Sequence, residues 1–245
     1  MAALAEVPVQ APDRHEIDWI GSIPFFGVHL ACALAIHTGV SWGAVAALVL
    51  TYWLRSIGIT GGYHRYFAHR TFRTSRTFQF VLALLGTLSL QKGVLRWAAL
   101  HRMHHAHSDQ PGDVHSPKEG VFWSHVGWIL SREYDDVSLE MIPDYAVYPE
   151  LRWLDRHYLV PFVLMCVGLV GLGGLEYLVW GAFISTTLLW HTTFCINSLC
   201  HIVGKRRYPT TDTSKNSLIL ALLTGGEGWH NNHHHYPNSV NQGFY

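Results

Sequence analysis

The sequence has little charge and few of the common cofactor motifs. Only 14% of its 245 residues are charged, and 17 basic residues balance 17 acidic ones. A formal net charge of zero gives no support to nucleic acid as a partner. No Gly-x-Gly-x-x-Gly and no Cys-x-x-Cys-His occurs, so neither a dinucleotide site nor a covalently attached haem is visible.

Cysteine is also scarce. The cysteines form no Cys-x-x-Cys pair, and three lie inside apolar stretches, where thiols commonly pack as small hydrophobic groups. Disulfides and zinc knuckles are therefore not expected. The first 18 residues carry Asp13, Glu16 and Asp18 and lack a basic segment followed by an apolar one, so no cleaved signal peptide is apparent. The four cysteines are Cys32, Cys166, Cys195 and Cys200.

Apolar sequence is abundant. Residues 20–40 and 44–60 form two runs of roughly 20 residues each, which at about 1.5 Å per residue can cross a hydrocarbon core of about 30 Å. Residues 159–172 and 175–196 repeat the pattern, with glycines at the turn. We expect one all-α integral membrane domain over residues 1–245, with four transmembrane helices in two hairpins. Two pairs of buried helices in a soluble bundle are the alternative.

The cations near these runs are distributed unevenly. The proposed turns at residues 38–43 and 171–174 contain no lysine or arginine, whereas cations flank the opposite ends of the helices. The positive-inside rule places those ends, and the histidine-rich segments beside them, in the cytoplasm. The flanking cations are Arg65, Arg70, Arg73, Arg76, Lys92, Arg96, Arg102, Lys205, Arg206, Arg207 and Lys215.

Two further stretches lie between the apolar runs. Residues 78–90 are apolar but too few to cross a membrane. A crossing there would also put two histidine-rich segments, residues 64–69 and 101–105, on opposite faces of the membrane, so we expect an interfacial or re-entrant helix. Residues 107–155 contain four prolines and most of the acidic residues, which predicts a helical cap outside the membrane.

Two histidine runs have helical spacing. The imidazoles in each run are three and four residues apart, which places them on one face of a helix. Each run can therefore bring two or three imidazoles to one metal ion. The runs are His101-Arg-Met-His104-His105 and His230-Asn-Asn-His233-His234.

The histidine run that comes first in the chain has a different spacing. His64 and His69 are five residues apart, which on an ideal helix separates them by about 140°. We therefore expect the chain to unwind just past the second apolar run, with Arg55 marking the membrane interface. Asn197 and His201 are four apart at the end of the last apolar run and are aimed at the same region.

Nine histidines exceed the four ligands of a structural zinc and fit two ions with four or five ligands each. Imidazole suits iron, copper, nickel and zinc alike, so ligand type leaves the metal open. Isolated histidines are more often hydrogen-bonded surface or core residues, which is our expectation for His15, His29, His37, His115, His125 and His157. Three histidines lie close to the runs in sequence or within the last apolar stretch: His107, His191 and His235. For each, a role in hydrogen-bonding a metal ligand and no role in the site are equally compatible with the sequence.

Five sequence blocks follow one another around these histidines: G-I-T-G-G-Y-H-R-Y-F-A-H, W-A-A-L-H-R-M-H-H-A-H-S-D, D-V-H-S-P-K-E-G-V-F-W-S-H-V-G-W, N-S-L-C-H and G-E-G-W-H-N-N-H-H. By their order and spacing the sequence resembles the membrane-bound fatty acid desaturases, specifically the delta-9 branch shared by acyl-CoA and acyl-lipid enzymes. The resemblance covers about residues 57–245.

The resemblance implies a mushroom-shaped protein with four membrane helices, a cytoplasmic cap and a di-iron centre without carboxylate ligands. It implies that two iron ions and dioxygen insert a cis double bond, at delta-9, into a saturated acyl chain carried on a lipid or on CoA. The implied ligands are His64, His69, His101, His104, His105, His201, His230, His233 and His234, with Asn197 reaching one iron through a water.

The resemblance also implies a bent tunnel for the acyl chain. The Gln, Trp and Thr that shape its bend match Gln91, Trp97 and Thr193, for which ordinary interfacial packing is the alternative. Chain length is expected to depend on bulk at the closed end, inside the second membrane helix. Leu48 and Tyr52 are the candidates there, and Tyr52→Ala is then expected to shift the products toward longer acyl chains.

Two departures from the family pattern bear on the carrier and on completeness. Animal acyl-CoA enzymes have an Arg-Asp pair before the second histidine run, where this chain has Ala99-Leu100. Together with H-S-D-Q-P-G-D-V-H-S-P and H-N-N-H-H, this resembles bacterial, cyanobacterial and plant members and favours a lipid-linked acyl chain over CoA. The chain ends at Tyr245, where relatives continue through a further cap segment, which leaves open whether it is truncated.

The electron source is expected to be a separate protein, a ferredoxin or a b-type cytochrome. A basic patch, whose residues are given below, could dock this donor, although attraction to the membrane surface explains the same cations.

Two other functions are the alternatives to desaturation. The same metal centre could instead hydroxylate a lipid or alkane. A histidine-rich metal transporter is disfavoured because transport sites lie near the bilayer midplane. The basic patch proposed for docking the electron donor comprises Arg70, Arg73, Lys205, Arg206 and Arg207.

Overall fold

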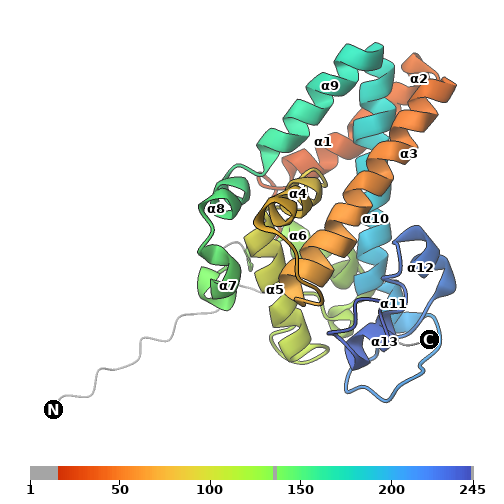
Figure 1. Cartoon of the computed structure of the whole chain (residues 1–245). Coiled ribbons are helices and arrows are strands. Elements are labelled where there is room, and N and C mark those ends of the chain that lie inside the picture. The colour runs from red at the N-terminus through yellow and green to blue at the C-terminus, as the bar shows by residue number, and fades with distance from the viewer. Residues whose placement is uncertain (1–15, 135–136, 244–245) are drawn as a thin grey trace, which may run out of the picture.

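The computed structural model describes residues 16–134 and 137–243, and these fold as helices joined by loops (Figure 1). The prediction of an all-α fold is confirmed. His15 and Asp13 lie outside the described residues. The α-helices are α1 (Ile23–Ala31), α2 (Ala35–Thr38), α3 (Trp42–Ile57), α4 (Arg76–Thr87), α5 (Val94–His107), α6 (Trp128–Leu130), α7 (Pro143–Ala146), α8 (Pro149–Arg156), α9 (Leu159–Leu178), α10 (Ser185–Asn197), α11 (Leu199–Ile202), α12 (Leu218–Leu223) and α13 (His230–His235). Wider π-helical turns are η2 (Gly58–Ala68), η4 (Trp123–Gly127) and η6 (Val179–Ile184), and 3₁₀ turns are η1 (Cys32–Leu34), η3 (Pro117–Glu119) and η5 (Leu139–Met141).

Two helical stretches are long and apolar enough to cross a membrane, Trp42–Ala68 and Leu159–Ile202. The first apolar run forms the shorter helix Ile23–Thr38. The second long stretch is interrupted at Gly173 and Gly174, where the backbone leaves the helical region and Gly174 adopts a φ of 65°. Glycine tolerates this left-handed conformation, which lets the chain reverse there. Residues before and after the reversal then pack together, as in the cluster of Phe162, Leu169 and Ala182.

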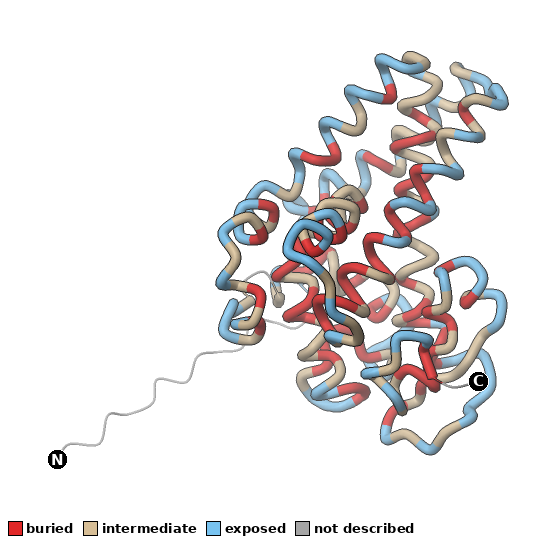
Figure 2. The backbone as a smooth tube through the Cα atoms, viewed as in Figure 1, coloured by how far each residue is buried: buried red, intermediate tan, exposed pale blue. Residues whose placement is uncertain are grey.

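The turns of the two hairpins lie together. Trp180 Nε1 donates a hydrogen bond of 2.8 Å to Gly39 O, and Ser41 Oγ donates one of 3.2 Å to Glu176 Oε2. Large apolar side chains at this end are exposed, among them Trp42 at 89% and Leu172 at 79%. Figure 2 shows the buried residues concentrated at the opposite end, among the short helices. An apolar surface of this extent is typical of contact with lipid or with another protein.

The helix that contains Arg55 continues to Ala68, so the chain stays helical beyond it, and the membrane interface at Arg55 stays a prediction. Its side chain is completely buried between α3 and α10, and it donates hydrogen bonds to the hydroxyls of Ser185 and Thr186 and to Thr51 O. Arginines within membrane helices usually face the protein interior and bond to polar groups there. Arg55 thus joins α3 to α10.

The double substitution Ser185→Ala and Thr186→Val removes two acceptors from the buried guanidinium of Arg55. We expect the free energy of unfolding to fall by about 2–6 kcal/mol, since each unsatisfied buried polar group costs about 1–3 kcal/mol. Thermal unfolding in detergent measures the loss. Adding Arg55→Met to the double variant is expected to restore part of the stability. A triple variant less stable than the double variant would contradict the assignment.

Close backbone contacts place the first two histidine runs. A Cβ on Gly58 would lie 2.3 Å from the backbone of Leu85 and Gly86, so only glycine allows η2 to approach α4 this closely. The N-terminus of α5 is fixed by Asp155, whose Oδ1 accepts hydrogen bonds from Leu95 N (2.8 Å) and Arg96 N (3.1 Å). These contacts enclose the main hydrophobic core, formed by η2, α4, α5 and the α7–α8 segment.

Candidate metal centre

The first histidine run does not unwind, contrary to our expectation, but widens into the π-helix η2. His69 N donates a hydrogen bond of 3.1 Å to His64 O, five residues earlier. This i→i+5 pattern puts residues five apart on the same side, and the two imidazole centroids lie 4.8 Å apart. The spacing that is unfavourable on an α-helix therefore suits a π-helix.

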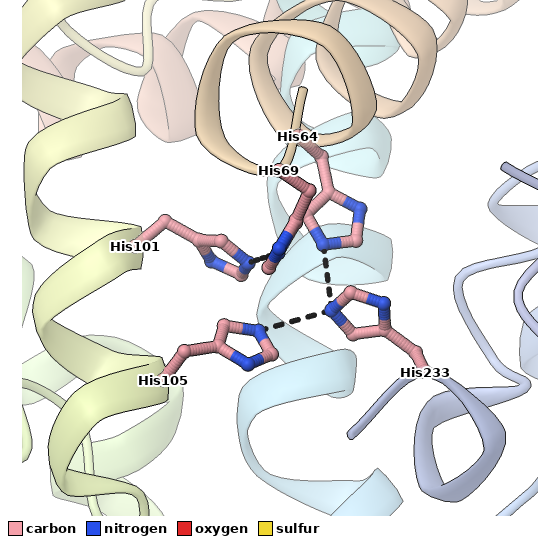
Figure 3. Close-up of side chains that lie close together, drawn as sticks. All are labelled: His64, His69, His101, His105 and His233. Atoms are coloured by element: carbon pink, nitrogen blue, oxygen red, sulfur yellow. Dashed lines mark hydrogen bonds between the residues drawn. The ribbon is translucent and has the colours of Figure 1, made fainter. Parts of the chain in front are cut away.

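Five histidines from three elements form a first cluster (Figure 3). One ring nitrogen from each lies within 4.8 Å of those of the others. His64 Nε2 lies 3.0 Å from His233 Nε2, and His105 Nε2 lies at the same distance from His233 Nε2. His69 Nε2 and His101 Nε2 are 2.8 Å apart. The members are His64 and His69 of the η2 region, His101 and His105 of α5, and His233 of α13.

Four other histidines form a second cluster with the same spacing limit, comprising His104, His201, His230 and His234. His201 Nε2 lies 3.1 Å from His230 Nε2. The two clusters adjoin, since the rings of His105 and His234 stack with centroids 4.6 Å apart. All nine predicted histidines are thus brought together, divided five and four.

Acidic side chains orient one histidine of the first cluster and three of the second. His104 Nδ1 donates to Asp113 Oδ1 at 2.7 Å, and His234 Nδ1 donates to Asp212 Oδ2 at 2.8 Å. His64 Nδ1 lies 2.6 Å from a carboxylate oxygen of Glu227.

His201 is oriented through an intervening hydroxyl. Thr213 Oγ1 donates its proton to Asp109 Oδ2 at 2.7 Å, so Thr213 Oγ1 can itself accept from His201 Nδ1 at 3.1 Å. These carboxylates were not predicted as part of the site. The only signal was that Asp109, Asp113 and Glu227 occur inside the blocks that surround the histidines.

This arrangement fits metal ions. A proton held on Nδ1 by a carboxylate leaves the Nε2 lone pair directed into the cluster, which is the form that binds a metal. Nε2 of His104 and of His234 is buried without a hydrogen-bond partner. Two nitrogens bound to one ion at about 2.0–2.1 Å, with their bonds at a right angle, lie about 3 Å apart, close to the distances seen here. Metal cations would relieve the repulsion between the facing lone pairs.

Burial keeps four of the imidazoles neutral. It lowers the pKa of His101, His105, His230 and His233 well below the ordinary value of 6.5, and nearby histidines lower it further. The carboxylate of Asp113 remains charged: although burial opposes ionisation, the hydrogen bond from His104 holds the pKa of Asp113 below its ordinary value of 3.8. Neutral imidazoles beside ionised carboxylates are the protonation states that metal binding requires.

The protein is expected to lose stability as the pH falls below about 6.5. Histidines whose pKa is lower in the folded state than in the unfolded state take up protons on unfolding, so acid favours the unfolded chain. Each such histidine contributes up to about 1.4 kcal/mol per pH unit below its unfolded pKa. The melting temperature of metal-free protein in detergent at pH 7.5 and pH 5.5 measures the effect. An equal or higher value at pH 5.5 would contradict the neutral assignment.

A mainly apolar cavity of about 200 Å³ adjoins the first cluster at His101. Gln91, Trp97 and Thr193 line it together, and they are connected by hydrogen bonds. Gln91 Nε2 donates to Thr193 Oγ1 at 3.3 Å, and Trp97 Nε1 donates to Gln91 Oε1 at 3.2 Å. Leu90 and Lys92, on either side of Gln91, have positive φ angles of 57° and 68°. Such backbone is costly for residues other than glycine and is often found at functional sites.

The structure places the other candidate residues at different points. Asn197 and His115 line the cavity beside His101. Leu48 and Tyr52 are not among the described residues that line it. The Tyr52 hydroxyl donates to Leu223 O at 2.7 Å, on the side of α12. A role for Leu48 and Tyr52 at the closed end of a tunnel therefore stays a prediction, which product chain length in Tyr52→Ala tests.

Three histidines outside the clusters form a hydrogen-bonded chain that joins α1, α10 and η4. His29 Nδ1 donates to Phe25 O at 2.7 Å, which leaves its Nε2 to accept from His191 Nε2 at 3.0 Å. His191 Nδ1 in turn accepts from His125 Nε2 at 2.9 Å. His29 and His125 are thus hydrogen-bonded structural residues, as predicted. His191 supports this chain and lies outside both clusters.

The fold and the site together define a helical protein that has two adjoining histidine clusters, each able to hold a metal ion, beside an apolar cavity. A family model described as fatty acid desaturase matches residues 40–240. The chain belongs to the fatty acid desaturase family, whose members are membrane-bound oxidoreductases that introduce a double bond into fatty acyl chains.

Named relatives cover most of the chain. It is 37% identical to the sn-1 stearoyl-lipid 9-desaturase of Anabaena variabilis over 234 residues, covering 94% of this chain and 86% of the relative. It is 38% identical to the sn-2 palmitoyl-lipid 9-desaturase of Nostoc sp. (strain 36), with 96% and 85% covered. It is 34% identical to the delta-9 acyl-lipid desaturase 1 of Arabidopsis thaliana, with 93% and 75% covered.

Proposed function

We propose that this protein is an oxygen-dependent acyl-lipid desaturase that introduces a cis double bond at the delta-9 position of a saturated chain. The observation that carries the proposal is the pair of histidine clusters beside an apolar cavity whose wall is fixed by Gln91, Trp97 and Thr193. The names of the relatives, which act on stearoyl-lipid and palmitoyl-lipid, support the acyl carrier and the position.

The cofactor proposed is a pair of iron ions. The ligands are the five histidines of the first cluster and the four of the second, with Asn197 acting through a water. Bound iron would supply the oxidising power that no side chain has, because removing hydrogen from an unactivated methylene requires activated dioxygen. The balanced reaction converts –CH2–CH2–, O2, two protons and two electrons into –CH=CH– and two water molecules.

The protein's own contribution is to position the chain and to exclude water. The apolar cavity holds the acyl chain beside His101, while the hydrogen bonds of Gln91 fix the indole of Trp97 against the His101 ring, whose centroid is 5.0 Å away. A fixed wall at this point would select one pair of methylenes for reaction. Regiochemistry would thus depend on the Gln91 side chain.

Gln91→Leu is expected to spread the double bond over neighbouring positions and to lower total product by about 10-fold or more, as small misplacements in an active site do. The substitution removes both hydrogen bonds but keeps a side chain of similar size. Gas chromatography with mass spectrometry of derivatised fatty acids locates the double bond. Unchanged position and yield, at unchanged iron content, would show that Gln91 only packs.

For topology, we propose four membrane helices in two hairpins, with α4 at the interface and the histidine clusters on the cytoplasmic side. The shared end of the two hairpin turns, which has exposed apolar side chains and no lysine or arginine, supports this arrangement. Membrane-impermeant thiol labelling of cysteines introduced at Ser41 and at Thr211 distinguishes the two faces. Labelling of both positions from the same side would contradict it.

As the source of electrons, we propose an external ferredoxin or b-type cytochrome, docked near Arg70, Arg73 and the exposed segment 205–207.

Expression of the protein in a strain that lacks its own desaturase tests whether the acyl carrier is a lipid or CoA. We expect the new double bond in membrane lipid extracted immediately after labelling with a saturated fatty acid. Its first appearance in the acyl-CoA pool would favour CoA as the carrier.

A further inference from the structure

A second cavity reaches the metal centre and differs from the acyl cavity in character. Its volume is about 220 Å³, its wall is almost entirely polar, and it shares no lining residue with the acyl cavity. Its mouth is formed by exposed residues at the end of α5 and in the following loop, Ala106 and Gln110, and in the loop between α11 and α12, Pro209 and Thr211. A water molecule needs only about 10–15 Å³ of such space, so several fit.

The floor of this polar cavity contains one ligand from each cluster, His105 of the first and His234 of the second. The acyl cavity reaches the clusters at a different histidine, His101, one helical turn before His105. Each ion would therefore have a ligand that borders the polar cavity. The two cavities contact the centre from separate parts of the protein.

One side chain in the floor points to a polar occupant. Ser108 is only 7% exposed, and its hydroxyl is buried without a hydrogen-bond partner. A buried hydroxyl without a partner is unfavourable, and ordered water commonly satisfies such groups. Asp212, beside Ser108 in the lining, is already engaged by His234, Thr210 and the backbone of Ser214.

A second route to the metal centre, for water and protons, is needed because of the reaction proposed above, on which this inference rests. Each turnover produces two water molecules and consumes two protons, while the acyl chain occupies the apolar cavity. Water released into that cavity would have to pass the acyl chain that fills it, along a wall that is mainly apolar. A separate polar path removes the conflict.

We propose that the polar cavity formed by Ser108, Gln110, Thr211 and their neighbours is the water side of the metal centre. Product water leaves through it, and water-sized polar molecules and small anions enter through it, while the acyl chain fills the other cavity. Access by azide, a small anion that binds iron, is then independent of the acyl substrate.

The test uses iron-loaded full-length protein without reductant, so that no turnover occurs. Stopped-flow absorbance measures the association rate of azide in the presence and absence of saturating stearoyl-lipid. Thr211→Cys places a thiol at the mouth, and a bulky methanethiosulfonate reagent then narrows it within an otherwise unchanged protein. Thr77→Cys, at an exposed position of α4, is the matched control, and treated wild-type protein corrects for the four native cysteines.

We expect stearoyl-lipid to leave the azide rate within about twofold of its lipid-free value, because the polar cavity stays open. Labelled Thr211→Cys is expected to bind azide at least about tenfold more slowly, with recovery after the label is removed by a thiol and desalting. Labelled Thr77→Cys is expected to match wild type. Loss of azide binding on adding lipid, or an unchanged rate in labelled Thr211→Cys, would overturn the proposal. Absence of iron or of unsaturated product would instead overturn the proposed function.

Discussion

Replacing His104 with alanine is expected to abolish double-bond formation, lowering product at least about 100-fold, and to reduce the iron bound to the purified protein. His104 is 1% exposed, its Nε2 is directed into the second cluster without a partner, and its Nδ1 is held by Asp113. The second cluster has only four histidines, so the loss of one leaves three. Fatty acid analysis and elemental analysis of the same preparation measure the two effects.

His157→Ala is the matched control for this prediction. His157 is an exposed histidine after α8 whose Nδ1 donates to Trp153 O, and it belongs to neither cluster. Its substitution is expected to leave iron content and product unchanged. A His104→Ala protein that keeps both its iron and its activity would remove His104 from the ligand set.

Asp113→Asn is expected to lower metal affinity by about 10–100-fold although no ligand is removed. The Asp113 carboxylate accepts hydrogen bonds from His104 Nδ1 and from the backbone of Asp109 and His115. An amide has one fewer acceptor oxygen and turns an NH2 group toward one of these donors, and it no longer supplies the charge that makes His104 a stronger base. Chelator competition at fixed pH gives the affinity.

The control for Asp113→Asn is Glu140→Gln, which neutralises an exposed carboxylate in η5. Circular dichroism is expected to show the same helix content in both variants. If Asp113→Asn bound metal as tightly as Glu140→Gln in the same chelator competition, the carboxylate would have a packing role only.

The local parts of the metal centre could be predicted from the sequence. Spacings of three and four residues in the second and third runs fix the relative directions of the imidazoles on α5 and α13, whatever the rest of the chain does. The same reasoning found His201, four residues after Asn197. The reversal of the chain lies at Gly173 and Gly174, where the glycines predicted a turn.

Features that depend on distant contacts could not be predicted in this way. The π-helix η2 forms where Gly58 and Gly62 bring its backbone against α4, and no spacing rule for an isolated helix includes that contact. The partner of His64 is Glu227, which lies 163 positions later, a pairing that only the folded chain reveals. The hydroxyl partners of Arg55 could not be predicted for the same reason, because they come from α10.

The central claim, that the two histidine clusters support desaturation of an acyl chain, is tested most directly by the mass of the product. Cells that lack their own desaturase are given a saturated fatty acid and express either wild-type protein or His104→Ala, and their acyl chains are analysed by mass spectrometry. The expected result is a loss of two mass units with wild type and no change with His104→Ala. A gain of sixteen mass units would identify a hydroxylase, and an unchanged acyl chain with iron-loaded wild-type protein and a functional electron donor would contradict the claim.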